Sequence, residues 1–275
     1  MKRILLALLT ATLAFGSQAQ NDSTLLTSTN PLVATTGPNV LGPGRLMLEG
    51  SFEGYMKEMS NIVIVTDDGP VGYNYRNLEA KTLLRFGVGS NTELMLGLSA
   101  SHASGILVQQ SIPDDNLTVT PAVGVRMKLY DGGLKWYQPR IAFLTTIGLP
   151  YRQGTPGNDD NEVLVEPLIG IQARHHLGHR LMLDWQLDYT WNEHYPSIEV
   201  GNGPHCMLAL RWLPTERWLL GVGSDIGMSW FEACWQATPA LQLSAHVGAS
   251  LGLSLTTSGN FINANALLGA SWRLR

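Results

Sequence analysis

The stretch RLMLDWQLDYTW, residues 180–191, alternates between two kinds of side chain over its whole length. Its odd positions carry Leu, Leu, Trp, Leu, Tyr and Trp, whereas its even positions carry Arg, Met, Asp, Gln, Asp and Thr. Successive side chains leave a β-strand on opposite faces, so the alternation predicts a strand with one apolar and one polar face. Ordinary strands have about five or six residues, and this one is much longer. Its apolar face contacts either a packed core or lipid.

The same alternation recurs along the chain in twelve segments. We predict strands at 44–57, 73–88, 92–101, 116–130, 136–149, 162–174, 180–192, 204–213, 217–228, 230–238, 240–251 and 261–274. We expect the apolar positions of these strands to exclude Asp, Glu, Lys and Arg. A charge that faces lipid costs about 2–4 kcal/mol at the membrane midplane.

The connections between these segments alternate in length. Those after every second strand are short, at 89–91, 131–135, 175–179, 214–216 and 239. The others are longer, at 58–72, 102–115, 150–161, 193–203 and 252–260, and only the join near Ser229 breaks the rule. Outer-membrane barrels have an even number of strands, short periplasmic turns and long extracellular loops. Three strand prolines, Pro121, Pro139 and Pro167, predict bulges or strand ends, because proline donates no ladder hydrogen bond.

A secreted β-sandwich is the competing interpretation, since it also contains many alternating strands. Its strands are shorter, however, and charged residues make up only 15% of this chain, against roughly 25% in soluble domains. We therefore predict an all-β, transmembrane, antiparallel β-barrel of twelve strands. Its polar faces line the lumen, and the barrel is closed because an unpaired strand edge is not tolerated in hydrocarbon.

The first residues, MKRILLALLTATLAFGSQAQ, have the layout of a secretory signal peptide. We predict a signal peptide at 1–19, a periplasmic tail or lumen plug at 20–43, and the barrel at 44–275. The predicted location is the outer membrane of a Gram-negative bacterium. The net charge of −4 gives no reason to expect a nucleic-acid partner.

The inward positions of the predicted strands carry most of the charge. The basic residues fall near the short-turn end and could form a basic inner mouth: Arg45, Arg85, Arg126, Lys128, Arg140, Arg174, Arg180 and Arg211. The acidic residues fall mostly at mid-lumen or further out: Glu49, Glu53, Glu79, Glu166, Asp184 and Asp188. Two interpretations remain open. The charges form an axially polarised pore, or they form a salt-bridge network that fills a narrow lumen.

The positions of four aromatic residues predict a site for a small ligand near the outer mouth. Tyr55, Tyr73, Tyr75 and Phe261 lie on strands that barrel closure makes neighbours, and all four point inward. An apolar wall with polar handles suits a small aromatic ligand. The alternative is that these rings pack beneath the extracellular loops.

The remaining candidates for chemistry are weak. Some outer-membrane barrels are lipid hydrolases, which need a Ser–His pair; Ser101, Ser104, His102 and His246 are available, but no G-x-S-x-G motif is present. We expect neither enzymatic activity nor a cofactor. The histidines of the 175–179 turn (His175, His176 and His179) are expected to be solvated and not to bind metal. Cys206 and Cys234 face opposite sides of the wall and are expected to be free thiols.

Three stretches resemble a known family: GPNVLGPGRLMLEGSF (37–52), PRIAFLTTIGLP (139–150) and ATPALQLSAHVGASLGL (237–253). They are similar to the outer-membrane barrels of the meta-pathway of phenol degradation family. The resemblance implies a channel or transporter for small hydrophobic or aromatic compounds. We expect outer-membrane lipid, the small-molecule solute and the barrel-assembly machinery as partners. The chain departs from the family at its end, which reads Trp-Arg-Leu-Arg where such barrels commonly end on an aromatic residue. A non-conducting structural or surface-interaction barrel is the alternative function.

Overall fold

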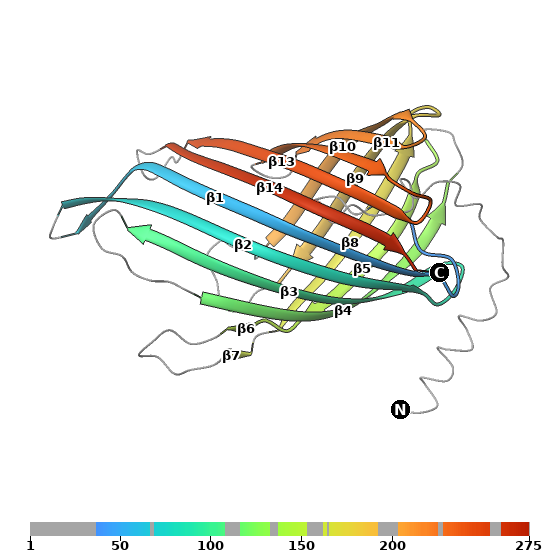
Figure 1. The fold of residues 1–275 in the computed structure, drawn as a ribbon, viewed down its shortest axis with the longest axis horizontal. Coiled ribbons are helices and arrows are strands. Elements are labelled where there is room, and N and C mark those ends of the chain that lie inside the picture. Colours follow the sequence, from blue (N-terminus) through green and yellow to red (C-terminus); the bar gives the residue numbers. More distant parts are fainter. Residues whose placement is uncertain are drawn as a thin grey trace.

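The computed structural model describes residues 37–66, 69–107, 116–132, 137–152, 162–163, 165–191, 203–224, 228–253 and 260–274. The predicted signal peptide and the rest of the segment before residue 37 lie outside these residues. The described part contains no helix that could cross a membrane. It consists of β-strands in one antiparallel sheet that closes on itself (Figure 1).

Twelve long strands form the wall, as predicted. Their bounds are β1 Leu46–Thr66, β2 Gly69–Gly87, β3 Thr92–Leu107, β4 Asn116–Asp131, β5 Arg140–Gly148, β8 Glu166–His176, β9 Leu181–Thr190, β10 Gly203–Thr215, β11 Trp218–Ser224, β12 Ser229–Gln236, β13 Leu241–Leu253 and β14 Asn260–Arg273. Each pairs with its neighbours in this order, and β14 pairs with β1 to close the ring. Two short pieces, β6 Tyr151–Arg152 and β7 Glu162–Val163, extend the hairpin of β5 and β8 at its outer end.

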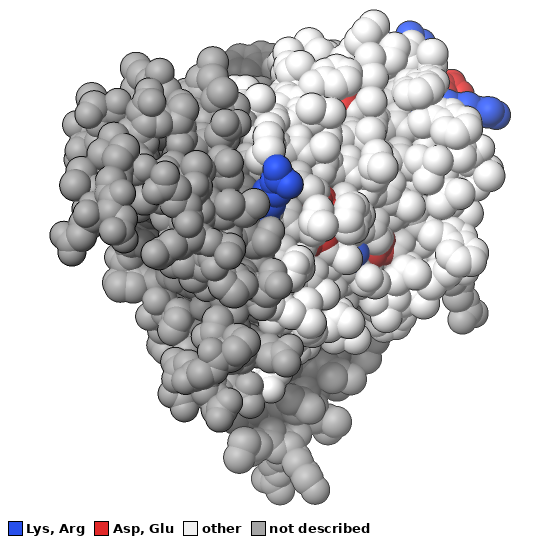
Figure 2. All heavy atoms as spheres, turned by 60° about the vertical axis from the view of Figure 1, so that its left-hand side comes forward, with Lys and Arg blue, Asp and Glu red and all other residues white. Residues whose placement is uncertain are grey.

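The two faces of the wall differ as the alternation predicts. In β9, Leu187 is 50% exposed, whereas Asp184 is 1% exposed on the opposite face. The large exposed hydrophobic side chains are spread over nearly every long strand, and the outer surface shows few charged groups (Figure 2). An apolar surface of this extent is stable in lipid and not in water. The RLMLDWQLDYTW stretch therefore turns its Leu, Trp and Tyr side outward and its Asp and Gln side into the barrel.

Several strand ends differ from the predictions. The expected loop 58–72 is largely strand, because β1 continues to Thr66 and β2 starts at Gly69. The sequence Ile-Val-Ile-Val at 62–65 explains the extension, since β-branched residues favour strands. This hairpin projects furthest at the end of the barrel opposite the C-terminus (Figure 1). Pro139 immediately precedes β5 and Pro167 is second in β8, while Pro121 lies on β4 beside the break between β5 and β6, so all three are at irregular or terminal positions.

Among the side chains that the structure describes, the expectation of a charge-free outer face is wrong at one position. Arg76 lies on the same face of β2 as Leu78 and Phe86, and its side chain is exposed. The physical reason is its depth. Arg76 lies ten residues from Phe86 along the strand, which corresponds to about 25 Å along the barrel axis at a tilt of about 40°. An apolar band is about that tall, so Arg76 lies at its outer boundary, where a charge is tolerated.

Candidate functional site: the barrel lumen

Four lumen residues of β1–β4 form a first charge cluster, defined as Glu49, Arg85, Glu93 and Arg126. All are at most 1% exposed. Arg85 donates from Nη1 to Glu49 Oε1 at 2.9 Å, and from Nε and Nη2 to the two oxygens of Glu93 at 3.0 and 2.9 Å. Arg126 Nη1 donates to Glu93 Oε1 at 2.9 Å. Two arginines and two carboxylates balance, so the cluster carries no net charge.

Four residues of β8–β12 form a second charge cluster, defined as Arg174, Asp184, Arg211 and Glu232. These are also at most 1% exposed. Arg174 donates from Nε and Nη2 to the two Asp184 oxygens, each at 2.7 Å. Arg211 donates to Asp184 as well, and to Glu232. This cluster too is neutral, and charge-assisted bidentate pairs of this kind are the strong form of ion pair.

Gly221 makes the contact between Arg211 and Glu232 possible. Arg211 lies directly opposite Gly221 on β11, and Gly221 lies directly opposite Glu232 on β12. The guanidinium must therefore reach across the whole width of β11. A Cβ at Gly221 would lie 2.4 Å from Glu232 Oε1, which is closer than any real contact. Glycine is the one residue that leaves this passage open.

Residues 37–42, called the inner segment here, lie inside the barrel against the first cluster. Leu41 donates its backbone N–H to Glu93 Oε2 at 2.8 Å, and its side chain packs on Met47. The Asn39 carbonyl accepts from Arg85 Nη2 at 3.1 Å, and the Asn39 side chain accepts from Arg140 on β5 at 3.4 Å. Asn39 thus joins β2 to β5 across part of the lumen.

A tight turn connects the inner segment to β1. Gly44 has a φ of 72°, which favours glycine, and Arg45 N donates to the Gly42 carbonyl at 3.1 Å. The segment passes so close to β2 that a Cβ at Gly87 would lie 2.0 Å from the Gly42 oxygen. The chain therefore folds back into the short-turn end of the lumen before it enters the wall. Together, the inner segment and the two clusters occupy this end.

The other charged residues predicted to face the lumen lie outside the two clusters. Arg180 lies on an exposed turn and donates to the Pro214 carbonyl at 3.2 Å. Asp131 lies 3.0 Å from both Lys128 Nζ and Arg140 Nε. Arg45, in the turn before β1, and Glu166, at the start of β8, are only partly buried. Further contacts lie higher in the lumen: Lys81 with Glu79 at 2.8 Å and Glu53 at 3.7 Å, and Asp188 with His205 at 3.4 Å.

The acidic partners are not separated from the arginines by depth as proposed. Glu49 and Asp184 contact the arginines directly, at the short-turn end. Glu93, which receives most of the bonds in the first cluster, was missing from the candidate residues. Its parity could have identified it, because it shares the inward face of β3 with buried Met95. The structure thus favours the network interpretation for these residues.

Outward of the clusters, one row of lumen positions runs across β12, β13, β14, β1 and β2. We call Trp230, Gly248, Asn265, Tyr55 and Asn77 the lumen row, because each lies directly opposite the next. Trp230 is only 5% exposed, and its ring leans over Gly223 on β11. The row presents aromatic rings at Trp230 and Tyr55, with two small or polar residues between them.

Polar atoms in the lumen row have no protein partner among the described residues. They are the indole Nε1 of Trp230 and the side-chain oxygens of Asn265 and Asn77. Asn265 uses its amide nitrogen to donate to Glu53 at 3.0 Å. A buried polar group without a partner costs free energy unless water or a ligand satisfies it. The row therefore offers a donor and two acceptors beside aromatic faces.

Of the predicted aromatic site, only Tyr55 has a described side chain. The backbone register does bring the four strand positions together, since Tyr73 and Phe261 both lie opposite Met59, and Tyr75 lies opposite Lys57. The side chains of those three residues lie outside the described part. Trp230 was missed, although its parity marks it as inward beside outward Phe231.

The remaining candidates are placed as follows. His246 is 3% exposed in the lumen, with its ring 5.8 Å from that of Trp230. His175 accepts from Trp185 Nε1 at 3.2 Å. Both cysteines are free, as predicted, with Cys206 exposed and Cys234 buried. The described residues contain no group of side chains that could hold a metal ion.

Comparison with known proteins shows similarity in fold but not in sequence. No family model matches the chain. No curated protein matches it either. An outer-membrane channel from Pseudomonas putida F1 superposes with a TM-score of 0.61 at 12% identity, over 88% of this chain and 100% of that one. The transport unit of the autotransporter AIDA-I from Escherichia coli superposes with a TM-score of 0.52 at 9% identity, over 98% and 97% of the two chains. The protein therefore has the fold of an outer-membrane β-barrel.

Proposed function

We propose that the protein is an outer-membrane channel for small hydrophobic or aromatic compounds. The observation that carries the proposal is the lumen row, where Trp230 and Tyr55 belong to one series of paired strand positions with unsatisfied polar atoms near them. Ligand sites for small molecules are mostly apolar and aromatic, with a few polar groups that orient the ligand. An aromatic compound with one hydroxyl group satisfies both features. The similarity to an outer-membrane channel, and the resemblance to the phenol degradation family, support this function.

In this proposal the solute enters at the long-loop end and occupies the lumen row. The two charge clusters and the inner segment then lie between the solute and the periplasm. Passage requires the inner segment to move, and this breaks the contact between Leu41 and Glu93. The two charge clusters and the inner segment thus keep the channel closed to ions while the solute is bound at the lumen row.

Uptake of phenol into proteoliposomes tests the proposal. The double variant Trp230→Leu with Tyr55→Leu removes both rings, and each aromatic contact contributes about 0.5–1.5 kcal/mol beyond its buried area. We expect uptake to fall about tenfold. Trp212→Leu is the matched control, because Trp212 is exposed on the outer face. Equal uptake by the double variant and the control would refute a role for the lumen row.

The buried clusters favour a second candidate, a non-conducting structural or surface-interaction barrel. Their eight residues are at most 1% exposed, so they leave no water-filled path at their own positions. The uptake of phenol into proteoliposomes distinguishes the channel from the structural barrel. A structural barrel adds nothing to the phenol uptake of protein-free liposomes, whatever the variant, whereas the wild-type channel increases uptake above that level.

A further inference from the structure

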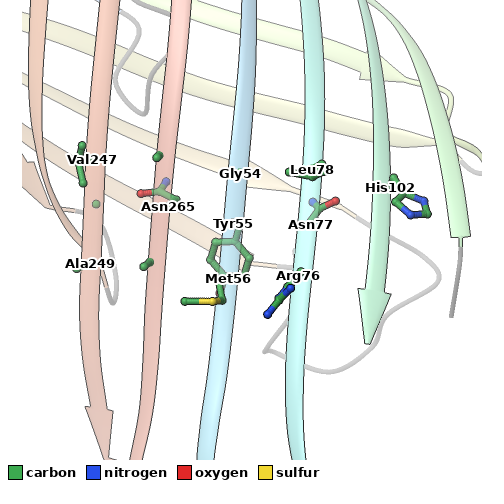
Figure 3. A pocket seen from close by; sticks show the side chains of 13 residues that line it. Gly54, Tyr55, Met56, Arg76, Asn77, Leu78, His102, Val247, Ala249 and Asn265 are labelled. Atoms are coloured by element: carbon green, nitrogen blue, oxygen red, sulfur yellow. The ribbon is translucent and has the colours of Figure 1, made fainter. Parts of the chain in front are cut away.

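The outer wall contains a groove that faces lipid, and four residues of the lumen row also line it, namely Tyr55, Asn77, Gly248 and Asn265. The groove has a volume of about 760 Å³ and runs along β13, β14, β1, β2 and β3 (Figure 3). Its floor on the outer face consists of small residues, namely Gly54, Ala249, Ala264 and Ala266. The outer surface is hollowed there because these small side chains project little from the backbone.

Larger apolar side chains border this floor. Val247 on β13 lies opposite Ala266, and Leu78 on β2 lies opposite Gly54, so the two large residues stand on either side. They are 61% and 49% exposed. Met56 lies one outward position further along β1, between Ala264 and Arg76. A depression of this width, with apolar sides, accommodates an acyl chain lying along the wall.

A basic residue lies at the outer end of the groove. The Arg76 side chain extends from β2 toward Met56 (Figure 3), and no described residue forms an ion pair with it. Apart from groups at the rim, few charged side chains are visible on the described part of this face (Figure 2). Arginine recognises phosphate through a planar fork of N–H donors. At the membrane boundary this group meets lipid headgroups and not acyl chains.

We propose that this groove binds the phosphorylated, multiply acylated glycolipid of the outer leaflet, lipid A. One acyl chain lies on the small-residue floor between Val247 and Leu78, and a lipid phosphate pairs with Arg76. The position of Arg76 decides the source of the phosphate, because it is at the long-loop end of the wall and a lipid of the inner leaflet cannot reach it. The site holds a structural lipid against β13–β3.

Native mass spectrometry of the purified protein in detergent, titrated with lipid A, tests this site. We expect Arg76→Gln to weaken lipid A binding about fivefold, the effect of one basic residue at a lipid surface. Arg217→Gln is the matched control, because Arg217 is exposed on a short turn at the opposite end. The control should bind as the wild type does. Retention of heat-modifiable gel mobility shows that each variant is folded.

Two further arms separate the contributions. Ala266→Leu fills the floor and should weaken lipid A and its dephosphorylated form alike, whereas Arg76→Gln should affect only the phosphorylated form. Phosphatidylglycerol should bind more weakly than lipid A. Equal binding of lipid A to the wild type and Arg76→Gln would overturn the proposal. So would equal affinity for lipid A and phosphatidylglycerol, or a loss of binding in Arg217→Gln as large as in Arg76→Gln.

Discussion

Glu93→Gln is the change that most directly probes the first charge cluster. Glu93 accepts from Arg85 twice, from Arg126 once and from the backbone of Leu41. Glutamine keeps the side-chain volume but replaces one oxygen by an NH₂ group. Each Glu93 oxygen accepts two hydrogen bonds, and an NH₂ group accepts none, so two of the four bonds are lost. Arg126, which is 1% exposed, is then left without a carboxylate partner among the described residues.

The expected loss follows from these contacts. A hydrogen bond to a charged group contributes about 1.5–3 kcal/mol, so two such bonds give about 3 kcal/mol or more. Removing one partner of a buried ion pair costs a similar amount, about 3–5 kcal/mol. We therefore expect the free energy of unfolding to fall by about 3 kcal/mol, a factor of roughly 150 in the equilibrium constant. Where the NH₂ group takes the place of Oε2, the Leu41 N–H also loses its acceptor, and its release should raise ion conductance.

Urea unfolding in lipid vesicles, followed by tryptophan fluorescence, measures the stability, and planar-bilayer recording measures the conductance. Glu79→Gln is the matched control, because Glu79 is 21% exposed and pairs with Lys81, so its loss should stay below about 1 kcal/mol. Adding Arg126→Met to Glu93→Gln removes the unpaired cation and should restore part of the stability. A loss in Glu93→Gln no larger than in the control would refute this account of the cluster.

Two further changes test the lumen and the wall. Gly221→Ala should destabilise the barrel by about 2 kcal/mol or more in the same unfolding assay, because the new methyl group displaces the buried Glu232 carboxylate. Gly178→Ala is the control and should be neutral, because a Cβ there meets open space. Equal effects of the two changes would contradict the close contact between Gly221 and Glu232. An apolar maleimide should label Cys206 in the detergent-solubilised, folded protein and leave Cys234 unmodified until urea is added, as mass spectrometry would show. Rapid labelling of Cys234 in the folded state would mean that its side of the wall is open.

The alternation of side chains predicted the strands well because a barrel in lipid imposes it on every strand. Residues 180–191 show the rule plainly, and the same rule located all twelve strands. It failed where the constraint ends. Beyond the membrane, the run at 62–65 stays in a strand through β-propensity, although the alternation around it had stopped. Arg76 shows that the outer face excludes charge only within the apolar band.

The lumen was predicted less completely, since parity gives the side of the wall but not the partner. Contact between Arg211 on β10 and Glu232 on β12 crosses β11, and it depends on the absence of a side chain at Gly221. Nothing local in the sequence marks that reach. The inner segment is similar, because Leu41 and Glu93 are 52 residues apart and meet only after the chain folds back. Long-range contacts of this kind follow from register, which single-strand patterns do not specify.

The distribution of charge among hairpins bears on how the wall is built. The hairpin of β8 and β9 brings its own neutral pair, Arg174 with Asp184, whereas Arg211 on β10 finds carboxylates on β9 and β12 and none on its hairpin partner β11. The β10–β11 hairpin therefore enters the membrane with a cation that only its later neighbour β12 fully compensates. Insertion of β8 to β12 as one cooperative unit avoids that exposed charge, so biogenesis of this half should proceed without a stable half-inserted stage.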